Sequence, residues 1–263
     1  MKLTIQNVTK KYSTRDKKRN EIHALNDVSF SIGDGEFCAV VGESGSGKST
    51  LSQIITGIIP ATRGTVYIND IEINPVQRRK NKEISKKIQL VLQDGKSALD
   101  PHFNIYECIA EPIRNLCKMS REQEKKRVYE LLEQMELSRE LLKRKPHELS
   151  GGQQKRVCIA RALATNPDIL ILDEAISGLD VLLRKNILDT LKRIYQESDC
   201  TMLFITHDMD VALYMANRII VMKDGVVVED THCNGNSDCL THPYSKLLAA
   251  AMMPENDKSV KTA

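Results

Sequence analysis

A glycine-rich run at residues 42–50 is the part of this chain best suited to chemistry. It follows an apolar stretch and precedes a segment that can form a helix. Glycines let a backbone turn so that its N–H groups face an anion, and a helix start adds a favourable dipole. In this pattern Lys48 reaches the β and γ phosphates of a nucleotide, and Ser49 coordinates Mg²⁺. The run, called the P-loop below, is predicted to hold a nucleoside triphosphate through Gly42, Glu43, Ser44, Gly45, Ser46, Gly47, Lys48, Ser49 and Thr50.

Two neighbouring carboxylates follow a second apolar run, Ile-Leu-Ile-Leu at residues 169–172. Asp173 is predicted to help hold the Mg²⁺ shell, and Glu174 to orient or deprotonate an attacking water. A carboxylate suits this reaction because phosphoryl transfer depends mainly on positioning and charge. An acidic helix cap is the plainer alternative, and the P-loop upstream disfavours it.

A third motif, Leu-Ser-Gly-Gly-Gln at residues 149–153, has two readings that can hold together. Ser150 and Gln153 form a capping box for the amphipathic helix that follows. Capping does not explain Gly151 and Gly152, which cost conformational entropy at a helix start. Bare backbone N–H groups that must approach an anion closely would explain them.

The elements that must position these motifs read as an α/β fold. Four apolar runs, at residues 37–41, 88–92, 169–172 and 202–205, are typical of strands buried on both faces of a parallel sheet. A polar group follows each run, and ligands bind outside the carboxyl ends of strands in open α/β sheets. Gln93 and His207 follow two of these strands, so they join the candidate site.

Other segments flank this core. Alternating residues at 3–8 and 28–32 predict half-buried antiparallel strands, and the basic stretch 10–20 between them predicts a solvated hairpin loop. Residues 100–146 read as helical, with Ser120 and Gln123 as a capping box, and predict an inserted helical subdomain at about 95–165. Asp224-Gly225 predicts a hairpin. The last residues, 254–263, are predicted to be a flexible tail.

Composition narrows the class of protein. The 263 residues are 41% hydrophobic and 28% charged, as in soluble globular proteins, and the formal charge is only +3. That charge and 4% aromatics give no reason to expect a nucleic-acid partner. Because no apolar run could span a bilayer or serve as a signal core, membrane contact is expected through a partner. Seven cysteines without a framework suit a reducing compartment.

Taken together, the motifs resemble the ATPase subunit of ATP-binding cassette (ABC) transporters over essentially the whole chain. The resemblance implies one nucleotide-binding domain at residues 1–253, with a P-loop NTPase core, an N-terminal antiparallel β-subdomain and an inserted α-helical subdomain. It implies that Tyr12 stacks on adenine and that Asp180 belongs to a nucleotide-contacting loop. The resemblance implies catalytic roles for Lys48, Gln93, Glu174 and His207. It also implies that Ser49, Gln93 and Asp173 coordinate Mg²⁺. ATP and Mg²⁺ are the implied cofactors, and each ATP is enclosed between one P-loop and the partner subunit's residues 149–153.

Two stretches resemble the peptide and nickel importer branch of this family: Gln93–Pro101, and Thr241-His-Pro-Tyr244 within the C-terminal motif at 241–250. That branch implies a related, non-identical second ATPase subunit, transmembrane permease subunits, an extracellular substrate-binding protein, and a peripheral location at the cytoplasmic membrane face. The chain departs from the family at Ala175, usually Pro, and at Gly178, commonly Ala. Nickel-type members have Ala after the glutamate, which favours nickel slightly over peptides.

Three alternatives stay open at the sequence level. An exporter ATPase is opposed mainly by the His-Pro-Tyr motif near the C-terminal end. A soluble, non-transport ABC ATPase acting on DNA or ribosomes would share the same motifs, but usually has a coiled-coil insertion, a zinc module or two cassettes. Separately, His232, Cys233, Cys239 and His242 could ligate a soft metal, as a cysteine-rich C-terminal cluster does in some relatives. Their spacing matches no zinc pattern, so this site is disfavoured.

Overall fold

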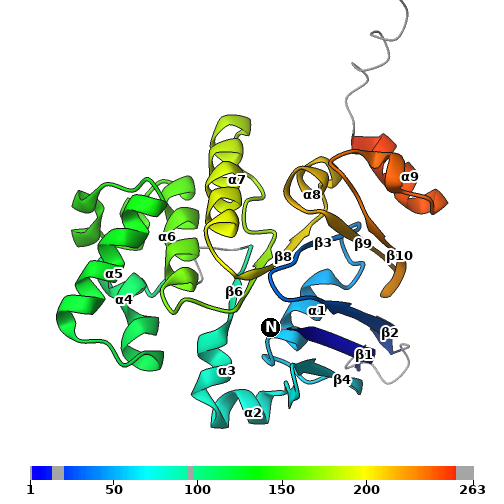
Figure 1. Ribbon diagram of the computed structural model, residues 1–263, viewed down its shortest axis with the longest axis horizontal. Coiled ribbons are helices and arrows are strands. Elements are labelled where there is room, and N and C mark those ends of the chain that lie inside the picture. Colours follow the sequence, from blue (N-terminus) through cyan, green and yellow to red (C-terminus); the bar gives the residue numbers. More distant parts are fainter. Residues whose placement is uncertain (1, 14–20, 94–97, 253–263) are drawn as a thin grey trace, which may run out of the picture.

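The computed structural model describes residues 2–13, 21–93 and 98–252, which form two sheets flanked by helices (Figure 1). The strands are β1 (Leu3–Tyr12), β2 (Ile22–Ile32), β3 (Phe37–Val41), β4 (Arg63–Ile68), β5 (Ile71–Glu72), β6 (Ile88–Val91), β7 (Ile169–Asp173), β8 (Thr201–Thr206), β9 (Arg218–Lys223) and β10 (Val226–His232). The α-helices are α1 (Lys48–Ile55), α2 (Pro75–Lys80), α3 (Lys82–Lys87), α4 (Ile105–Leu116), α5 (Arg121–Gln134), α6 (Gly151–Leu163), α7 (Val181–Gln196), α8 (Met209–Met215) and α9 (Pro243–Met252). Short 3₁₀ turns lie at Arg139–Lys143, Pro146–Glu148 and Ser237–Cys239.

The larger sheet has the strand order β10-β9-β3-β8-β7-β6. β9, β3, β8, β7 and β6 pair in parallel, and β10 pairs antiparallel with β9. Every residue of β3, β7 and β8 is buried, which confirms the prediction for three of the four apolar runs. The fourth run forms β6, but its two middle residues are only partly buried, so burial on both faces is wrong there. The register sets Val41 beside Thr206 and Asp173 beside Ile205, so the strands end at one edge. That shared edge gathers the residues that follow each strand.

The smaller sheet is antiparallel, with the order β2-β1-β4-β5, as the N-terminal pattern predicted. Leu51, Ile54 and Ile55 of α1 pack in one apolar cluster with residues of both sheets, so α1 lies in the core between them. The expected loop at residues 10–20 is wrong at its start, because β1 continues to Tyr12 and pairs with Ile22. The rest of that expectation, residues 14–20, lies outside the described residues.

Helices α4, α5 and α6 gather on the side of the larger sheet away from β1 and β2 (Figure 1). The predicted capping box starts α5: Gln123 N donates to Ser120 Oγ at 3.3 Å, and Ser120 N donates to Gln123 Oε1 at 2.8 Å. Val128, Leu131 and Leu132, at helical spacing, are buried against the other helices. The helical content predicted for residues 100–146 is therefore confirmed.

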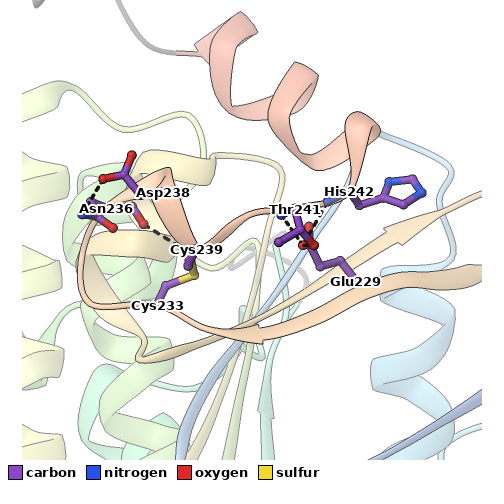
Figure 2. The surroundings of a disulfide bond; sticks show 7 residues. All are labelled: Glu229, Cys233, Asn236, Asp238, Cys239, Thr241 and His242. Atoms are coloured by element: carbon purple, nitrogen blue, oxygen red, sulfur yellow. Dashed lines mark hydrogen bonds between the residues drawn. A yellow bond between two sulfur atoms is a disulfide. The ribbon is translucent and has the colours of Figure 1, made fainter.

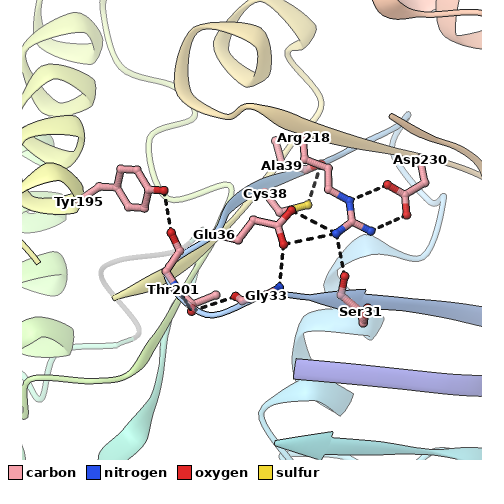
Figure 3. A network of polar contacts seen from close by, with 10 residues as sticks. Ser31, Gly33, Glu36, Cys38, Ala39, Tyr195, Thr201, Arg218 and Asp230 are labelled. Carbon is pink, nitrogen blue, oxygen red and sulfur yellow. Dashed lines mark hydrogen bonds and ion pairs between the residues drawn. The ribbon is translucent and has the colours of Figure 1, made fainter. Parts of the chain in front are cut away.

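A polar network closes the amino end of the parallel sheet, opposite the edge described above (Figure 3). Arg218 donates to both carboxylate oxygens of Asp230 at 2.7 Å, to Ser31 O at 2.7 Å and to Glu36 Oε1 at 3.1 Å. Its hydrogen bonds with Asp230 raise the pKa of Arg218, so it stays charged. Because Ser31 belongs to β2 and Arg218 to β9, the network joins the two sheets.

The C-terminal segment begins with the hairpin that Asp224-Gly225 predicted. After β10 the structure contains a disulfide between Cys233 and Cys239, so the expectation that the cysteines lack a framework is wrong for this pair. Both sulfurs are consumed in that bond and cannot act as thiolate ligands. α9 then packs on α8. None of the helices in the described part of the chain is long and apolar enough to cross a membrane. The predicted tail, 254–263, lies outside the described residues.

Candidate active site

A cleft of about 620 Å³ opens at the carboxyl edge of the parallel sheet. The segments after β3, β6, β7 and β8 all reach it, as expected for an open α/β sheet. The residues that line it are Ile22, His23, Ala24, Glu43, Ser44, Gly45, Gly47, Lys48, Ser49, Thr50, Gln93, Glu174 and His207. Sequence reasoning thus placed ten of its residues together, from four separate motifs.

The P-loop turns into α1 through a conformation that requires glycine. Gly47 has φ 100°, and a Cβ there would lie 2.3 Å from Ala24 O. Gly47 O accepts from Leu51 N at 2.9 Å, which starts the helix, and among the described residues no side chain caps it. The first N–H groups of α1 are therefore left for another acceptor, such as a phosphate.

Lys48 is buried at the floor of the cleft, with 4% of its surface exposed. Its amine donates to Gly42 O at 2.8 Å and to Glu43 O at 2.7 Å. Burial lowers the pKa of Lys48, and the nearby carboxylates of Glu174 and Asp173 oppose that shift. The amine is thus a partly desolvated cation, held by carbonyls and directed at the loop that would cradle phosphates.

Asp173 and Ser49 form a pair of hard oxygen donors beside the cleft. Ser49 Oγ donates to Asp173 Oδ1 at 3.1 Å, and Ser52 Oγ donates to Asp173 Oδ2 at 2.7 Å. Asp173 is 2% exposed, and this burial raises its pKa. A hydroxyl, a carboxylate and the nearby Gln93 amide are ligands that Mg²⁺ accepts when substrate phosphates complete its shell. The donor set therefore fits the predicted ion.

Glu174 and His207 face each other across the ends of β7 and β8. Glu174 Oε1 lies 3.4 Å from His207 Nδ1, and Glu174 N donates to Ile205 O at 2.9 Å. Glu174 has φ 47°, a left-handed conformation that costs free energy for a residue with a Cβ. The strand-end hydrogen bond holds this turn, which aims the carboxylate at the cleft rather than along the sheet.

Tyr12 and Gln93 lie nearer the rim. Gln93 is exposed and lines the cleft, as predicted. Tyr12 is 40% exposed and does not line it, although its strand partner Ile22 does. Lys10 Nζ lies 5.1 Å from the Tyr12 ring centroid. The adenine-stacking role of Tyr12 remains a prediction.

The motif at residues 149–153 and Asp180 are not part of the cleft. Ser150 and Gln153 make the predicted capping box, since Gln153 N donates to Ser150 Oγ at 3.3 Å and Ser150 N donates to Gln153 Oε1 at 3.0 Å. A Cβ on Gly152 would lie 2.2 Å from Leu183 Cδ2, so close packing against this side chain favours a glycine here. Gly151 is exposed and has nothing within 4 Å of its Cβ position, so the anion-binding reading rests on it.

Asp180 is the exposed N-cap of α7, and its Oδ1 accepts from Leu183 N at 2.9 Å. Lys155 of α6 donates to Ser177 O, which connects the helix after residues 149–153 to the turn before Asp180. Both motifs thus lie on one connected surface outside the cleft, and within one chain they do not meet the P-loop.

Sequence reasoning missed two contributions. Ser52 holds the buried oxygen of Asp173, and its position three residues after Ser49 on a helix was the available signal. Ile22, His23 and Ala24 form one wall of the cleft from the start of β2, and nothing in their residue types marks them.

Comparison with known proteins decides the family. A family model described as ABC transporter matches residues 25–177. The chain belongs to the ABC transporter family. It is 39% identical over 230 residues to the nickel import ATP-binding protein NikE of Brucella abortus (strain 2308), covering 88% of this chain and 86% of that protein. It is 40% identical over 243 residues to the oligopeptide transport ATP-binding protein OppF of Bacillus subtilis, covering 91% and 79%.

Solved structures agree with this assignment. A dimeric ATP-binding cassette in a post-hydrolysis state, bound to ADP and Pi, is 37% identical with a TM-score of 0.78, covering 88% of this chain and 98% of that chain. CbiO1 from Clostridium perfringens, described as part of an ABC transporter complex, is 30% identical with a TM-score of 0.74, covering 89% and 88%. This ABC transporter subunit therefore has the predicted ABC ATPase fold, binds ATP and is an ATPase.

Proposed function

We propose that this ABC ATPase drives the import of peptides, nickel or a metal chelate. The similarity to NikE and OppF along most of the chain supports an importer. Ala175 after the glutamate, a feature of the nickel-type members that the chain resembles, slightly favours nickel over peptides. The C-terminal motif at 241–250 supports the same branch.

One observation supports the two-subunit mechanism: within one chain, the P-loop and residues 149–153 lie on different surfaces. The cleft holds the P-loop, Glu174 and His207, whereas Ser150 and Gly151 are exposed on another surface. ATP in the cleft would thus be bound from one side. We infer that a second, related ATPase subunit packs head to tail, so that its residues 149–153 and Asp180 equivalent enclose the nucleotide. The dimeric state of the similar solved cassette supports this arrangement.

The roles follow from the geometry of the cleft. Lys48 and the N–H groups of the P-loop would bind the β and γ phosphates, with the adenine against Tyr12. Ser49, Asp173 and Gln93 would hold Mg²⁺, which when bound neutralises charge on the phosphates. Glu174 would orient or deprotonate the attacking water, and His207, 3.4 Å from it, would fix the carboxylate and contact the γ-phosphate.

This function also requires a membrane complex. We propose that residues 1–253 act as one nucleotide-binding domain, with a helical subdomain at about 95–165, bound peripherally to permease subunits at the cytoplasmic face of the membrane. An extracellular binding protein would deliver the cargo to those permeases. The partner ATPase would be a paralogue rather than a second copy.

Uptake tests this proposal. The chain is co-expressed with the permease, binding protein and ATPase encoded beside it, and accumulation of radioactive nickel and of a labelled tripeptide is measured separately. The proposal predicts that one cargo accumulates, that Lys48→Ala abolishes accumulation, and that the chain sediments with membranes only when the permease is present. A chain that instead sediments with ribosomes or DNA at moderate salt, with no uptake, would refute the importer assignment.

A further inference from the structure

The Cys233–Cys239 disulfide lies in the segment that joins β10 to α9 (Figure 2). The two Cα atoms are 5.4 Å apart and the residues are six positions apart in sequence. Cys233 is 1% exposed and its N–H donates to Asn217 O at 2.8 Å, whereas Cys239 is half-buried. The other five cysteines of the chain form no disulfide within the described residues. One sulfur of the pair is therefore fixed in the core, and the other can be reached by a thiol.

The fold also offers a hydrogen-bond acceptor to the reduced form of the pair. Cys239 Sγ lies 3.3 Å from Asn236 O, although a bonded sulfur has no proton to donate. After reduction, the Cys239 thiol would find that carbonyl as an acceptor. The Cys239 thiol would thus have a partner after reduction, and the main effect of opening the bond is to release the path of residues 233–240.

Those residues lead directly into an anchored turn. Glu229 Oε1 of β10 accepts from Thr241 N at 2.5 Å, from Thr241 Oγ1 at 2.7 Å and from His242 N at 3.1 Å (Figure 2). His242 Nδ1 in turn accepts from Tyr244 N at 3.2 Å. The disulfide and the Glu229 carboxylate therefore hold the start of α9 from two sides.

Tyr244 follows this anchored turn and lies beside the P-loop. Its side chain is buried, and Lys223 Nζ lies 4.7 Å from its ring centroid. Its hydroxyl is buried without a well-formed hydrogen bond among the described residues, yet it lies beside Glu43. Burial raises the pKa of Tyr244, the Glu43 backbone opposes this rise, and the Glu43 carboxylate adds to it. The Glu43 carbonyl is one of the two that hold the Lys48 amine, at 2.7 Å.

The hairpin before this segment contacts the same loop. Gly225 N, in the β9–β10 turn, donates to Ser46 O at 3.2 Å. A Cβ on Gly42 would lie 2.2 Å from Met222 O, so the P-loop backbone packs directly on the end of β9. The β9–β10 hairpin and Tyr244 therefore both lie beside the P-loop, one before and one after the segment that the disulfide closes.

We propose that Cys233 and Cys239 are a thiol–disulfide control site for ATP binding, with Tyr244 as the positioning residue that transmits their state to Glu43 and Lys48. The oxidised pair orders residues 233–241, and the P-loop then keeps the conformation described above. Reduction by a dithiol loosens this segment and weakens ATP binding. The inference rests on ATP occupying the cleft, as in the proposed function.

The reduction balances as an ordinary thiol–disulfide exchange. A thiolate of the dithiol attacks Cys239 Sγ, the more accessible sulfur, and Cys233 leaves as a thiolate that takes up a proton. The second thiol of the dithiol then attacks the dithiol sulfur that is bonded to Cys239, and Cys239 leaves as a thiolate. Two electrons pass to the cysteine pair, and the dithiol becomes a disulfide.

Calorimetric titration of the full chain with Mg-ATP tests the proposal. The oxidised protein is expected to bind at least about fivefold more tightly than protein reduced with dithiothreitol. The double variant Cys233→Ser/Cys239→Ser should bind like reduced protein and ignore dithiothreitol. Tyr244→Ala should bind weakly in both redox states, and Tyr244→Phe, which keeps the ring over Lys223, should recover part of the difference.

Hydrogen exchange separates positioning from loss of folding. Reduction should increase exchange in peptides covering residues 42–50 and leave those from α5 unchanged. Equal affinity of oxidised and reduced protein would overturn the proposal, as would a full redox difference that survives in Tyr244→Ala. If neither redox form binds ATP, while both are folded, the failure belongs to the ATP site itself and not to its redox control.

Discussion

Replacing Ser52 with alanine removes the hydrogen bond that holds the buried oxygen of Asp173. Ser52 is 0% exposed and Asp173 is 2% exposed, and the Oγ–Oδ2 distance is 2.7 Å. No water can replace the lost hydroxyl without room beside it, so Asp173 Oδ2 would be left unsatisfied. Ser52 Oγ also lies 2.9 Å from Ser49 O, a neutral carbonyl of the same helix. The substitution is small and suits a helix, which limits its effect to these two contacts.

A hydrogen bond to an ionised group contributes about 1.5–3 kcal/mol, and a neutral one about 0.5–1.5 kcal/mol. We therefore expect Ser52→Ala to lower the free energy of unfolding by about 2 kcal/mol at neutral pH. For a chain of this size that corresponds to a fall in Tm of roughly 4–8 °C.

The loss should depend on pH because Asp173 titrates. Burial raises the pKa of Asp173 above its ordinary value, and the Ser52 hydrogen bond opposes that rise. In Ser52→Ala the pKa in the folded state therefore moves higher still. Folded protein then binds more protons, so the variant loses stability relative to the parent as pH rises through this range. The difference is largest above the folded-state pKa and shrinks as pH falls through it.

Urea denaturation at about pH 8 and about pH 4.5 measures both effects. Thr56→Val is the matched control: its hydroxyl lies one turn further along, is equally buried and donates to Ser52 O at 2.9 Å, a neutral acceptor. The control should cost about 1 kcal/mol at both pH values. If Ser52→Ala cost no more than Thr56→Val at pH 8, or the same at both pH values, the reasoning about Asp173 would be refuted.

Three further substitutions test the turn of the P-loop, the network that joins the two sheets, and the packing of α6 against Leu183. Gly47→Ala should abolish ATP binding in a calorimetric titration and cost about 2 kcal/mol or more in denaturation, because φ is 100° and the new Cβ would meet Ala24 O at 2.3 Å; parental binding would contradict this. Arg218→Met should cost about 1–3 kcal/mol in denaturation, because it leaves the partly buried Glu36 carboxylate and Ser31 O without this donor, and a change within about 0.5 kcal/mol would exclude the network as a structural clamp. Gly152→Ala should cost about 1–3 kcal/mol in denaturation through overpacking against Leu183, and an unchanged free energy of unfolding would contradict this.

The parallel sheet and the cleft were predictable because their signals are local and periodic. Continuous apolar runs fixed the buried strands, and the end of each run located Asp173, Glu174 and His207. The shared carboxyl edge of a parallel sheet then brings such residues together whatever their distance in sequence. The capping boxes at Ser120 and Ser150 were equally local.

What the sequence could not supply depends on contacts between distant segments. Tyr244 reaches Glu43 only because the C-terminal hairpin packs beside the P-loop, and no periodicity encodes that approach. The extension of β1 through Lys10 to Tyr12 was missed because charged residues at the end of a strand look like a loop in the sequence. The Cys233–Cys239 bond required knowing that the chain doubles back between them.

Glu174→Gln gives the most direct test of the claim that two subunits enclose ATP and that Glu174 acts on water. The variant keeps the size of the side chain and loses its charge and its ability to accept a proton. Purified with its partner ATPase and Mg-ATP, it should run as a stable dimer in gel filtration and retain unhydrolysed ATP, with turnover lowered by about 10²–10⁴. Parental turnover, or a monomer that fails to dimerise with ATP bound, would contradict the account.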